Sequence, residues 1–497
     1  MTPLGAGVLY LGLDACDPDV VRDGARTGAF PTFRALLERG AVARVVNPPA
    51  LYVGAVWPSF WTSRSPARHG RYCYRQIVPG TYRERPVLAD DVRDPPFWSA
   101  LGAAGRSTTV FDVPKTPPDP SIRGEHVVDW GTHDPDPPGL RTQPPGLADE
   151  VRAAIGSTPM PPCDQVRRTA ADWRQFADGL LDRIRRRERW IESRLTEDWD
   201  AVIACHTESH CAGHQAWHLH DATHERHDAA LAAETGDVLL EVYRALDASV
   251  GRLLARAGER RVMVHLSHGM GPHHDGTAAL DEMLERLEPH LPPGRPVSLK
   301  GRLARVVDRP RTRRWSRKVL RRFGRPLPVP SRRAARLSFL VPNNEAWAGI
   351  RANVVGREPT GRVPAGSALD AFLAALCERL AEVRNAATGE PVFDRIERTR
   401  DLFTGPLEGA LPDVVARWRR DRPIEALRHP QAGRTEGRFK GFRTGDHREE
   451  GLVLATGPGV RAGLASEPVR VEDLGPTLCG WLGVPVPDVD GRPSPAL

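Results

Sequence analysis

The chain has 497 residues, of which 40% are hydrophobic and 27% are charged, a composition typical of soluble globular proteins. No stretch approaches the run of about 18 apolar residues that a membrane-spanning helix needs, so we expect no transmembrane segment. The net charge is +7, but residues 301–338 alone hold fourteen Arg or Lys residues against one acid, so the basic excess is local.

Apolar runs and helical periodicity alternate along the chain, which favours an α/β fold with a largely parallel sheet. Residues 88–145 are rich in Pro, Asp and Gly and indicate loops with short elements, and the chain ends in a helix and a Pro-rich tail. The predicted strands are 7–13, 41–46, 108–113, 199–205, 261–266, 347–355 and 452–456, and the predicted helices include 28–41, 165–198, 235–256 and 368–383.

Histidines are most concentrated in residues 201–221, AVIACHTESHCAGHQAWHLHD. The first of them, His206, comes directly after the predicted strand 199–205. Ligands of α/β proteins bind beyond the carboxyl ends of strands, and His is the commonest protein metal ligand. A helix here would place His206, His210 and His214 on one face, because they recur every four residues. His206 and His218 are better explained as surface or supporting groups. The alternative interpretation is a solvated, His-rich loop.

The cysteines and the amino terminus indicate the compartment. Seven scattered cysteines without CxxC spacing favour reduced thiols and a cytoplasmic location. The first apolar run lacks the basic region of a signal peptide, so we interpret it as a strand.

The Arg-rich segment 301–338 allows contact with nucleic acid or an anionic surface. We favour a solvated excursion, because only Trp315 and Phe323 provide aromatic rings within it.

Several motifs together resemble the type I phosphodiesterase/nucleotide pyrophosphatase family of the alkaline phosphatase superfamily. They are LGLDACDPD, PTFRALLERGA, AVWPSFWTSRSPARHG, AGHQAWH, YRALDASVGRLL, SHGMGP, IRANVVGREPTGRV, GDHREEGLVLATGPGV and VEDLGPTLCGWLGVPVPDVDGRP, in this order. The resemblance implies an alkaline-phosphatase-like sandwich, with a central, mostly parallel sheet flanked by helices. It implies a single catalytic domain over residues 1–497. Insertions near 120–165 and 285–345 are candidate caps, the second of them Arg-rich.

The resemblance also implies a two-metal site, usually zinc, beneath a Thr or Ser nucleophile. Asp14, His214, His268 and His447 match ligand positions of the family. Three other positions depart from the pattern: the nucleophile position holds Val53, and two expected Asp positions hold His210 and Ser267.

These departures favour one metal ion instead of two. Two dications need carboxylates to offset their charge, and Asp14 is the only one of the three expected Asp residues that remains. The predicted ligands are Asp14, His210, His214, His268 and His447. A His-dominated set suits a divalent transition metal, with zinc as first choice and iron or another transition metal as the alternative.

The predicted function is a metal-dependent hydrolase or transferase that acts on a phosphate ester, or else a sulfate ester, through metal-activated water. Its substrate would be a small anionic molecule. We assign catalytic roles to Asp14, His268 and Glu208, and substrate binding to Lys440 and Arg443.

Other groups lie near the same motifs. Candidate substitutes for the missing nucleophile are Tyr52, Ser59, Thr62, Cys211 and Ser267, and His273, His274 and Asp275 are candidates for a compensating ligand or base. Two further hypotheses stay open. One is a mononuclear metalloenzyme with non-hydrolytic, including oxidative, chemistry, and the other is a non-catalytic binding member of the family.

Overall fold

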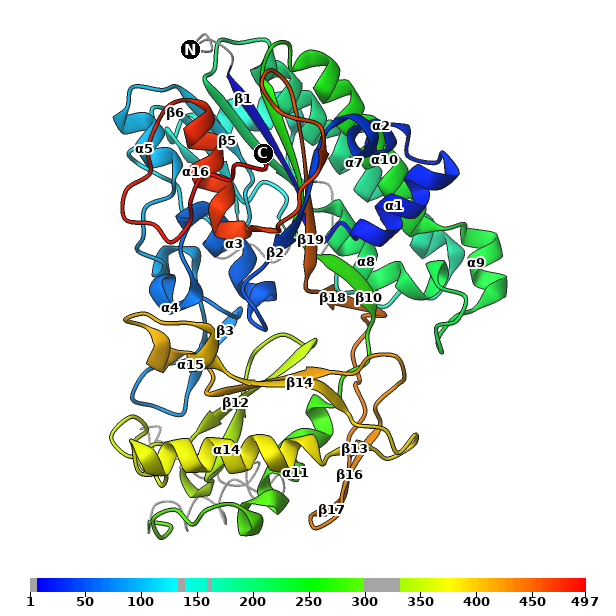
Figure 1. Cartoon of the computed structure of the whole chain (residues 1–497). Coiled ribbons are helices and arrows are strands. Elements are labelled where there is room, and N and C mark those ends of the chain that lie inside the picture. Colours follow the sequence, from blue (N-terminus) through cyan, green and yellow to red (C-terminus); the bar gives the residue numbers. More distant parts are fainter. Residues whose placement is uncertain (1–6, 133–138, 159–162, 299–330) are drawn as a thin grey trace, which may run out of the picture. The chain divides into compact units, whose positions relative to one another are not determined.

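The computed structural model describes residues 7–132, 139–158, 163–298 and 331–497. The chain forms two compact units (Figure 1). The first comprises residues 1–71, 88–273 and 441–497, and the second comprises residues 72–87 and 274–440. A single catalytic domain with a cap at 285–345 stays a prediction. Most of the Arg-rich segment, residues 301–330, lies outside the described residues.

The first unit is built on a central sheet with ten strands among its described residues. The order is β20 (Gly463–Leu464), β2 (Ala41–Val46), β19 (Glu450–Thr456), β9 (Arg261–Leu266), β1 (Val8–Leu13), β8 (Ala201–His206), β5 (Thr108–Phe111), β6 (Gly124–Val128) and β7 (Arg141–Gln143), with β21 (Val469–Arg470) paired to β2. Strands β9, β1, β8, β5 and β6 are parallel, whereas β19 and β7 pair antiparallel with their neighbours. The predicted α/β fold with a mostly parallel central sheet is confirmed.

Helices cover both faces of this sheet (Figure 1). Side chains along β1 alternate between two hydrophobic clusters, with Leu9 and Leu11 in one and Val8 and Tyr10 in the other, as the two-residue period of a strand requires. The first cluster includes α1 (Pro18–Thr27), α2 (Pro31–Arg39), α6 (Leu147–Ile155), α7 (Ala170–Leu195), α8 (Glu208–His220) and α10 (Val238–Arg256). The second includes α3 (Tyr52–Thr62), α5 (Trp98–Ala103) and α16 (Val471–Trp481).

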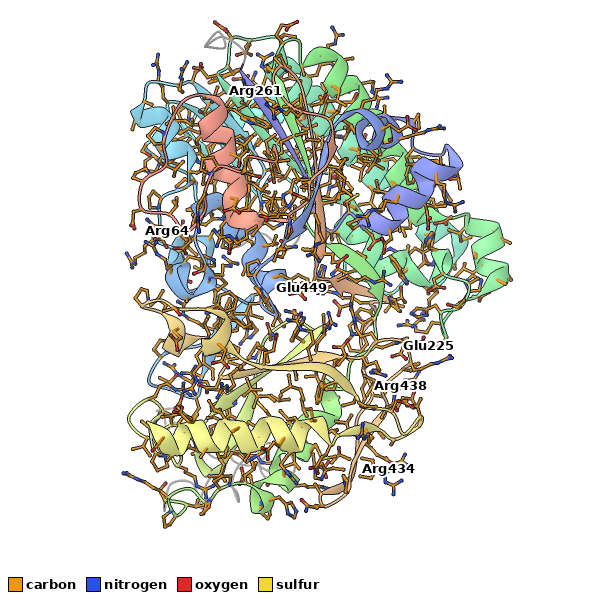
Figure 2. All side chains as sticks on the ribbon, in the orientation of Figure 1. Arg64, Glu225, Arg261, Arg434, Arg438 and Glu449 are labelled. Carbon is orange, nitrogen blue, oxygen red and sulfur yellow. A yellow bond between two sulfur atoms is a disulfide. The ribbon has the colours of Figure 1, made fainter. Side chains whose placement is uncertain are left out.

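Local capping residues set the ends of these helices. The Asp17 carboxylate accepts hydrogen bonds from the first turn of α1, and Gly28, with φ 82°, caps the carboxyl end of this helix. Thr169 and Asp172 form a capping box at the start of α7. Short elements complete the unit: α4 (Pro66–His69), a 3₁₀ turn at Ala89–Asp91 and α9 (Ala229–Thr235). Arg64, labelled in Figure 2, donates hydrogen bonds to the carboxylate and the carbonyl oxygen of Asp488, which ties the carboxyl-terminal tail to this unit.

The second unit contains a four-stranded antiparallel sheet among its described residues. Its order is β11 (Ser338–Val341), β12 (Trp347–Ala352), β15 (Val414–Trp418) and β14 (Phe393–Arg398). Helices α11 (Thr277–Leu287) and α14 (Ser367–Ala381) share a hydrophobic core with this sheet. The remaining elements are β3 (Arg75–Ile77), β4 (Glu84–Pro86), β13 (Arg384–Asn385), β16 (Ala426–His429), β17 (Gly433–Glu436), α15 (Thr399–Leu402) and 3₁₀ turns at Glu288–His290, Arg332–Ala335 and Glu408–Ala410.

Two features refine or correct the sequence analysis. The His-rich stretch is not a loop, because α8 begins at Glu208, two residues after β8 ends. The expectation of reduced thiols is wrong for Cys163 and Cys211, which form a disulfide. Cys211 is therefore removed from the candidate nucleophiles. Among the described helices, none combines the length and the apolar character needed to cross a bilayer.

Candidate metal centre

Three parallel strands end at the same edge of the central sheet. Leu13 at the end of β1 pairs with His206 of β8 on one side and with Leu266 of β9 on the other. The next residues along β1 and β9, Asp14 and Ser267, therefore leave the sheet together. This edge is where ligands bind in parallel α/β sheets.

Helix α8 and a small antiparallel ladder add the remaining histidines to this edge. His210 and His214 are four residues apart on α8, so they share a face, and both are buried. His447 lies on β18 (Gly445–Arg448), which pairs with β10 (Gly269–Pro272). His268 is the residue directly before β10. Five residues predicted as ligands from distant parts of the sequence are thus brought together, although their role as ligands stays a prediction.

The Nε2 atoms of three histidines converge on one point. His447 Nε2 lies 3.0 Å from His214 Nε2 and 3.3 Å from His210 Nε2. Ligand nitrogens about 2.0–2.1 Å from one tetrahedral zinc ion lie about 3.3 Å from each other. One ligand atom from each of the three histidines lies within 4.8 Å of the other two, so the group could hold a metal ion.

The backbone fixes the orientation of one of these rings. His214 Nδ1 lies 2.8 Å from the carbonyl oxygen of Gly445, and a carbonyl can only accept, so we place the proton on Nδ1. The lone pair of His214 Nε2 is then directed at the cluster, as is usual for a metal-binding His. Gly445 also packs against α8: a Cβ atom on it would lie 2.1 Å from the carbonyl oxygen of Gly213.

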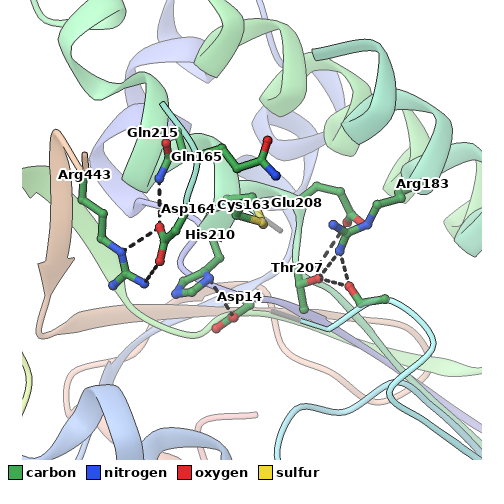
Figure 3. The surroundings of a disulfide bond; sticks show 12 residues. Asp14, Cys163, Asp164, Gln165, Arg183, Thr207, Glu208, His210, Gln215 and Arg443 are labelled. Atoms are coloured by element: carbon green, nitrogen blue, oxygen red, sulfur yellow. Dashed lines mark hydrogen bonds and ion pairs between the residues drawn. A yellow bond between two sulfur atoms is a disulfide. The ribbon is translucent and has the colours of Figure 1, made fainter. Parts of the chain in front are cut away.

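Asp14 and His268 flank the three histidines. Asp14 Oδ1 accepts a hydrogen bond from Trp57 Nε1 at 2.8 Å and another from Ser267 Oγ at 3.3 Å. Asp14 Oδ2 lies 4.0 Å from His210 Nδ1 (Figure 3). His268 Nε2 lies 3.8 Å from Asp14 Oδ1. Burial lowers the pKa of His268 and the Asp14 charge opposes this shift only in part, so the ring is neutral at pH 7, as a metal ligand must be.

The position of the family nucleophile is also close to this edge. Val53 is half-buried in the first turn of α3. Its neighbour Tyr52 donates a hydrogen bond to the His447 carbonyl oxygen at 2.9 Å, and its ring lies 5.8 Å from that of His268. Ser267 Oγ accepts a hydrogen bond from the Ala15 N–H at 3.0 Å. The polar side chains of Tyr52 and Ser267 are thus engaged in holding the site together.

Glu208 has a different environment from the one that its sequence position suggests. Its carboxylate is fully buried and contacts Arg187 at 2.8 Å and Arg183 at 3.2 Å. Burial alone would raise the pKa of Glu208, but the charges of Arg187 and Arg183 outweigh it and hold that pKa well below its usual value. These contacts fit a structural anchor beneath α8. The catalytic role of Glu208 stays a prediction that the geometry does not support.

The remaining candidates are spread more widely. Arg443 donates two hydrogen bonds to the Asp164 carboxylate, and Lys440 is exposed and belongs to the second unit, so substrate binding by either stays a prediction. His218 and His220 contact Thr444 and Asp237, respectively. Four other candidates make local contacts: Ser59 contacts His69, Thr62 donates to the Pro58 carbonyl oxygen, His274 contacts the Arg420 carbonyl oxygen, and Asp275 accepts a hydrogen bond from the Thr277 N–H.

Two side chains near the site escaped the sequence analysis. Trp57 lies in an apolar helix, where the sequence indicates only a core residue, yet its Nε1 binds Asp14. Asp164 lies in a Pro-rich segment without periodicity, yet it contacts both α8 and Arg443. No local pattern distinguishes these two residues from others of their type.

Comparisons with known proteins indicate the family of the chain. The model of the type I phosphodiesterase/nucleotide pyrophosphatase family matches residues 8–322. No curated protein sequence matches the chain significantly.

Similar solved structures include phosphonoacetate hydrolase from Sinorhizobium meliloti 1021 (14% identity, 96% of this chain and 95% of that chain, TM-score 0.49). Murine ectonucleotide pyrophosphatase/phosphodiesterase 5 is 13% identical over 98% of this chain and 97% of its own, with a TM-score of 0.49. A mutant of the alkaline phosphatase PafA is 13% identical over 99% of both chains, with a TM-score of 0.48. Since the family model covers more than half of the chain, the protein belongs to the type I phosphodiesterase/nucleotide pyrophosphatase family.

Proposed function

We propose that this protein hydrolyses a phosphate ester at a site that holds one divalent transition metal ion. Family membership supports an enzyme that acts on phosphoesters. The observation that carries the single-metal proposal is the convergence of His210, His214 and His447 through their Nε2 atoms. Asp14 and His268 complete the proposed ligand and catalytic set.

The charge of the site supports one ion over two. Of the five grouped side chains, only Asp14 is an acid, and Trp57 and Ser267 already donate to one of its oxygens. Two dications held by these five side chains would therefore share a single carboxylate. Three neutral imidazoles and one carboxylate suit zinc, with iron as the alternative.

The residues of this chain favour direct attack by water. A metal ion in such a site supplies Lewis-acid activation of water and of a phosphoryl oxygen. Val53 has no nucleophilic atom, so the family's nucleophile position cannot form a covalent phosphoryl intermediate in this chain. His268 is buried and neutral beside Asp14, and we assign it to bind the ion or to accept a proton.

Metal content and hydrolysis test this proposal together. We expect protein purified without added metal to contain about one zinc per chain and to hydrolyse bis-p-nitrophenyl phosphate. His214→Ala is expected to lose both properties. His220→Ala is the matched control, because His220 lies on the same helix but pairs with Asp237. Two zinc ions per chain would contradict the single-site proposal, and p-nitrophenyl sulfate tests the sulfate ester.

A second candidate is a mononuclear enzyme with non-hydrolytic, including oxidative, chemistry. The observation that favours it is the donor set, in which His210 and Ser267 stand at two of the three Asp positions of the family pattern and Asp14 is the one carboxylate that remains. Stoichiometric iron or copper, together with no hydrolysis of either ester after loading with zinc, would support this candidate over the first.

A further inference from the structure

A short segment anchored by a disulfide reaches both elements that carry the clustered histidines. Cys163 is bonded to Cys211, which lies on α8 between His210 and His214 in sequence. This covalent bond fixes the start of residues 163–167, here named the anchored segment, on the helix that presents two of the predicted ligands.

The next residue of the anchored segment connects α8 to the chain leading into β18. Asp164 Oδ1 accepts a hydrogen bond from Gln215 Nε2 of α8 at 2.9 Å. The same carboxylate accepts hydrogen bonds from Arg443 Nε and Nη2, at 3.0 and 2.7 Å (Figure 3). Arg443 lies two residues before β18 begins at Gly445. One carboxylate therefore joins the two elements that carry His214 and His447.

The anchored segment also binds the oxygen of the Gln215 amide. Arg167 Nη1 donates to Gln215 Oε1 at 3.0 Å and to the Cys163 carbonyl oxygen at 3.1 Å. The Arg167 guanidinium lies 3.8 Å from the centre of the Phe176 ring on α7. The nitrogen and the oxygen of the Gln215 amide are thus both hydrogen-bonded to the anchored segment. These two bonds limit the movement of the segment along α8.

The position of the residues after Arg443 matters for the metal centre. Thr444 N donates to the His214 carbonyl oxygen at 2.8 Å, and the Gly445 carbonyl oxygen is the acceptor for His214 Nδ1. A shift of residues 443–445 along α8 would therefore rotate His214 and move His447 at the same time. The anchored segment resists this shift.

We propose that the anchored segment is a positioning element for the metal centre, acting through Asp164, and this inference rests on the proposed function. The Asp164–Arg443 pair is partly exposed, with 39% and 24% of the respective side chains accessible, and such a pair alone contributes little. The disulfide holds Asp164 close to α8, which raises its effective concentration next to Arg443. Both the covalent bond and the carboxylate are therefore needed.

The test measures metal binding instead of turnover. Full-length protein is stripped of metal by a chelator and titrated with Co²⁺, whose visible absorption reports ligand geometry. We expect Asp164→Asn and Cys163→Ser each to weaken Co²⁺ binding about five- to tenfold and to change the absorption band. Glu241→Gln is the matched control. The Arg174–Glu241 pair is also bidentate and partly exposed, but it joins α7 to α10, which carry none of the clustered histidines.

Reduced wild-type protein provides a second test that does not depend on the folding of a variant. Treatment with a dithiol transfers two electrons and two protons to the disulfide, which gives two protein thiols and the cyclic disulfide of the reagent. After removal of the reagent, thiol titration and circular dichroism confirm a reduced, folded chain, and we expect the same weakened Co²⁺ binding as in Cys163→Ser.

The possible outcomes separate this inference from the proposed function. Wild-type affinity and spectrum in Asp164→Asn, Cys163→Ser and the reduced protein would overturn the positioning role. His214→Ala decides the other question. If it still binds Co²⁺ like the wild type, the proposed metal site itself is wrong; if it loses binding while the other variants keep it, only the positioning role is wrong.

Discussion

His214 Nε2 and His447 Nε2 lie 3.0 Å apart, although 233 positions separate the two residues in the sequence. With His210 Nε2 also 3.3 Å from His447 Nε2, three basic nitrogens meet. A proton on His447 Nε2 can be donated to one neighbour at a time, whereas a metal ion satisfies all three lone pairs together. The arrangement is therefore better explained by an ion than by hydrogen bonds among imidazoles.

Trp57 offers a test of the support around Asp14. We expect Trp57→Phe to weaken zinc binding about tenfold, because groups that orient metal ligands typically contribute 10- to 100-fold. The affinity is measured by competition with a chromophoric chelator. Trp61→Phe on the same helix is the control, since Trp61 is buried and its Nε1 has no hydrogen-bond partner among the described residues. Equal effects of the two changes would show that Trp57 acts only through packing.

Position 53 tests the inherited nucleophile site. We expect Val53→Thr to raise hydrolysis of bis-p-nitrophenyl phosphate severalfold, because it places a hydroxyl group in the first turn of α3, where the family resemblance puts the nucleophile. Val53→Ala, which adds no hydroxyl, should not show this gain. A Val53→Thr rate at or below the wild-type rate would indicate that this position no longer faces the substrate.

The buried ion pairs below α8 predict a large loss of stability. Arg187 contacts both Glu208 and Asp112, at 2.8 and 2.6 Å, and all three side chains are fully buried. Glu208→Gln leaves excess buried positive charge, and we expect the free energy of unfolding to fall by about 3–5 kcal/mol. Chemical denaturation measures the change. Glu38→Gln, which breaks an exposed pair with Arg34, should leave it almost unchanged.

Glu472 predicts a pH-dependent difference in stability. Burial raises the pKa of Glu472 to about 7 from the ordinary value of 4.5. Below pH 4.5 the carboxyl is protonated in both states, and between pH 4.5 and 7 the folded state binds more protons, so stability falls as the pH rises.

The variant Glu472→Gln removes this loss. We expect the variant to match the wild type near pH 4 and to exceed it at pH 8 by up to about 3 kcal/mol. Chemical denaturation at the two pH values checks the difference. A variant less stable than the wild type at pH 8 would contradict the assigned cause.

Much of the fold followed from local pattern in the sequence. The apolar runs at 7–13 and 261–266 became β1 and β9, because a strand buried on both faces needs no polar alternation. The family resemblance supplied Asp14, His268 and His447, and the spacing of the His-rich stretch indicated His210 and His214. The sequence therefore indicated which residues would meet.

The sequence did not predict which side chains surround those residues. Glu208 stands among histidines in sequence, yet its environment is set by Arg183 and Arg187 from the preceding helix. The disulfide joins residues 48 positions apart, and no spacing rule selects Cys163 and Cys211 from seven cysteines. Such pairings depend on how helices pack, which a local pattern does not encode.

The close contact of Gly445 with the Gly213 carbonyl oxygen gives the site a requirement that no metal-binding atom reveals. A methyl group at position 445 would meet that oxygen at 2.1 Å, so even alanine would force the strand away from the helix. Transfer of this centre to another scaffold would therefore have to copy a bare stretch of backbone along with the imidazoles. Two hydrogen atoms on one α-carbon are as much a part of the site as its nitrogen donors.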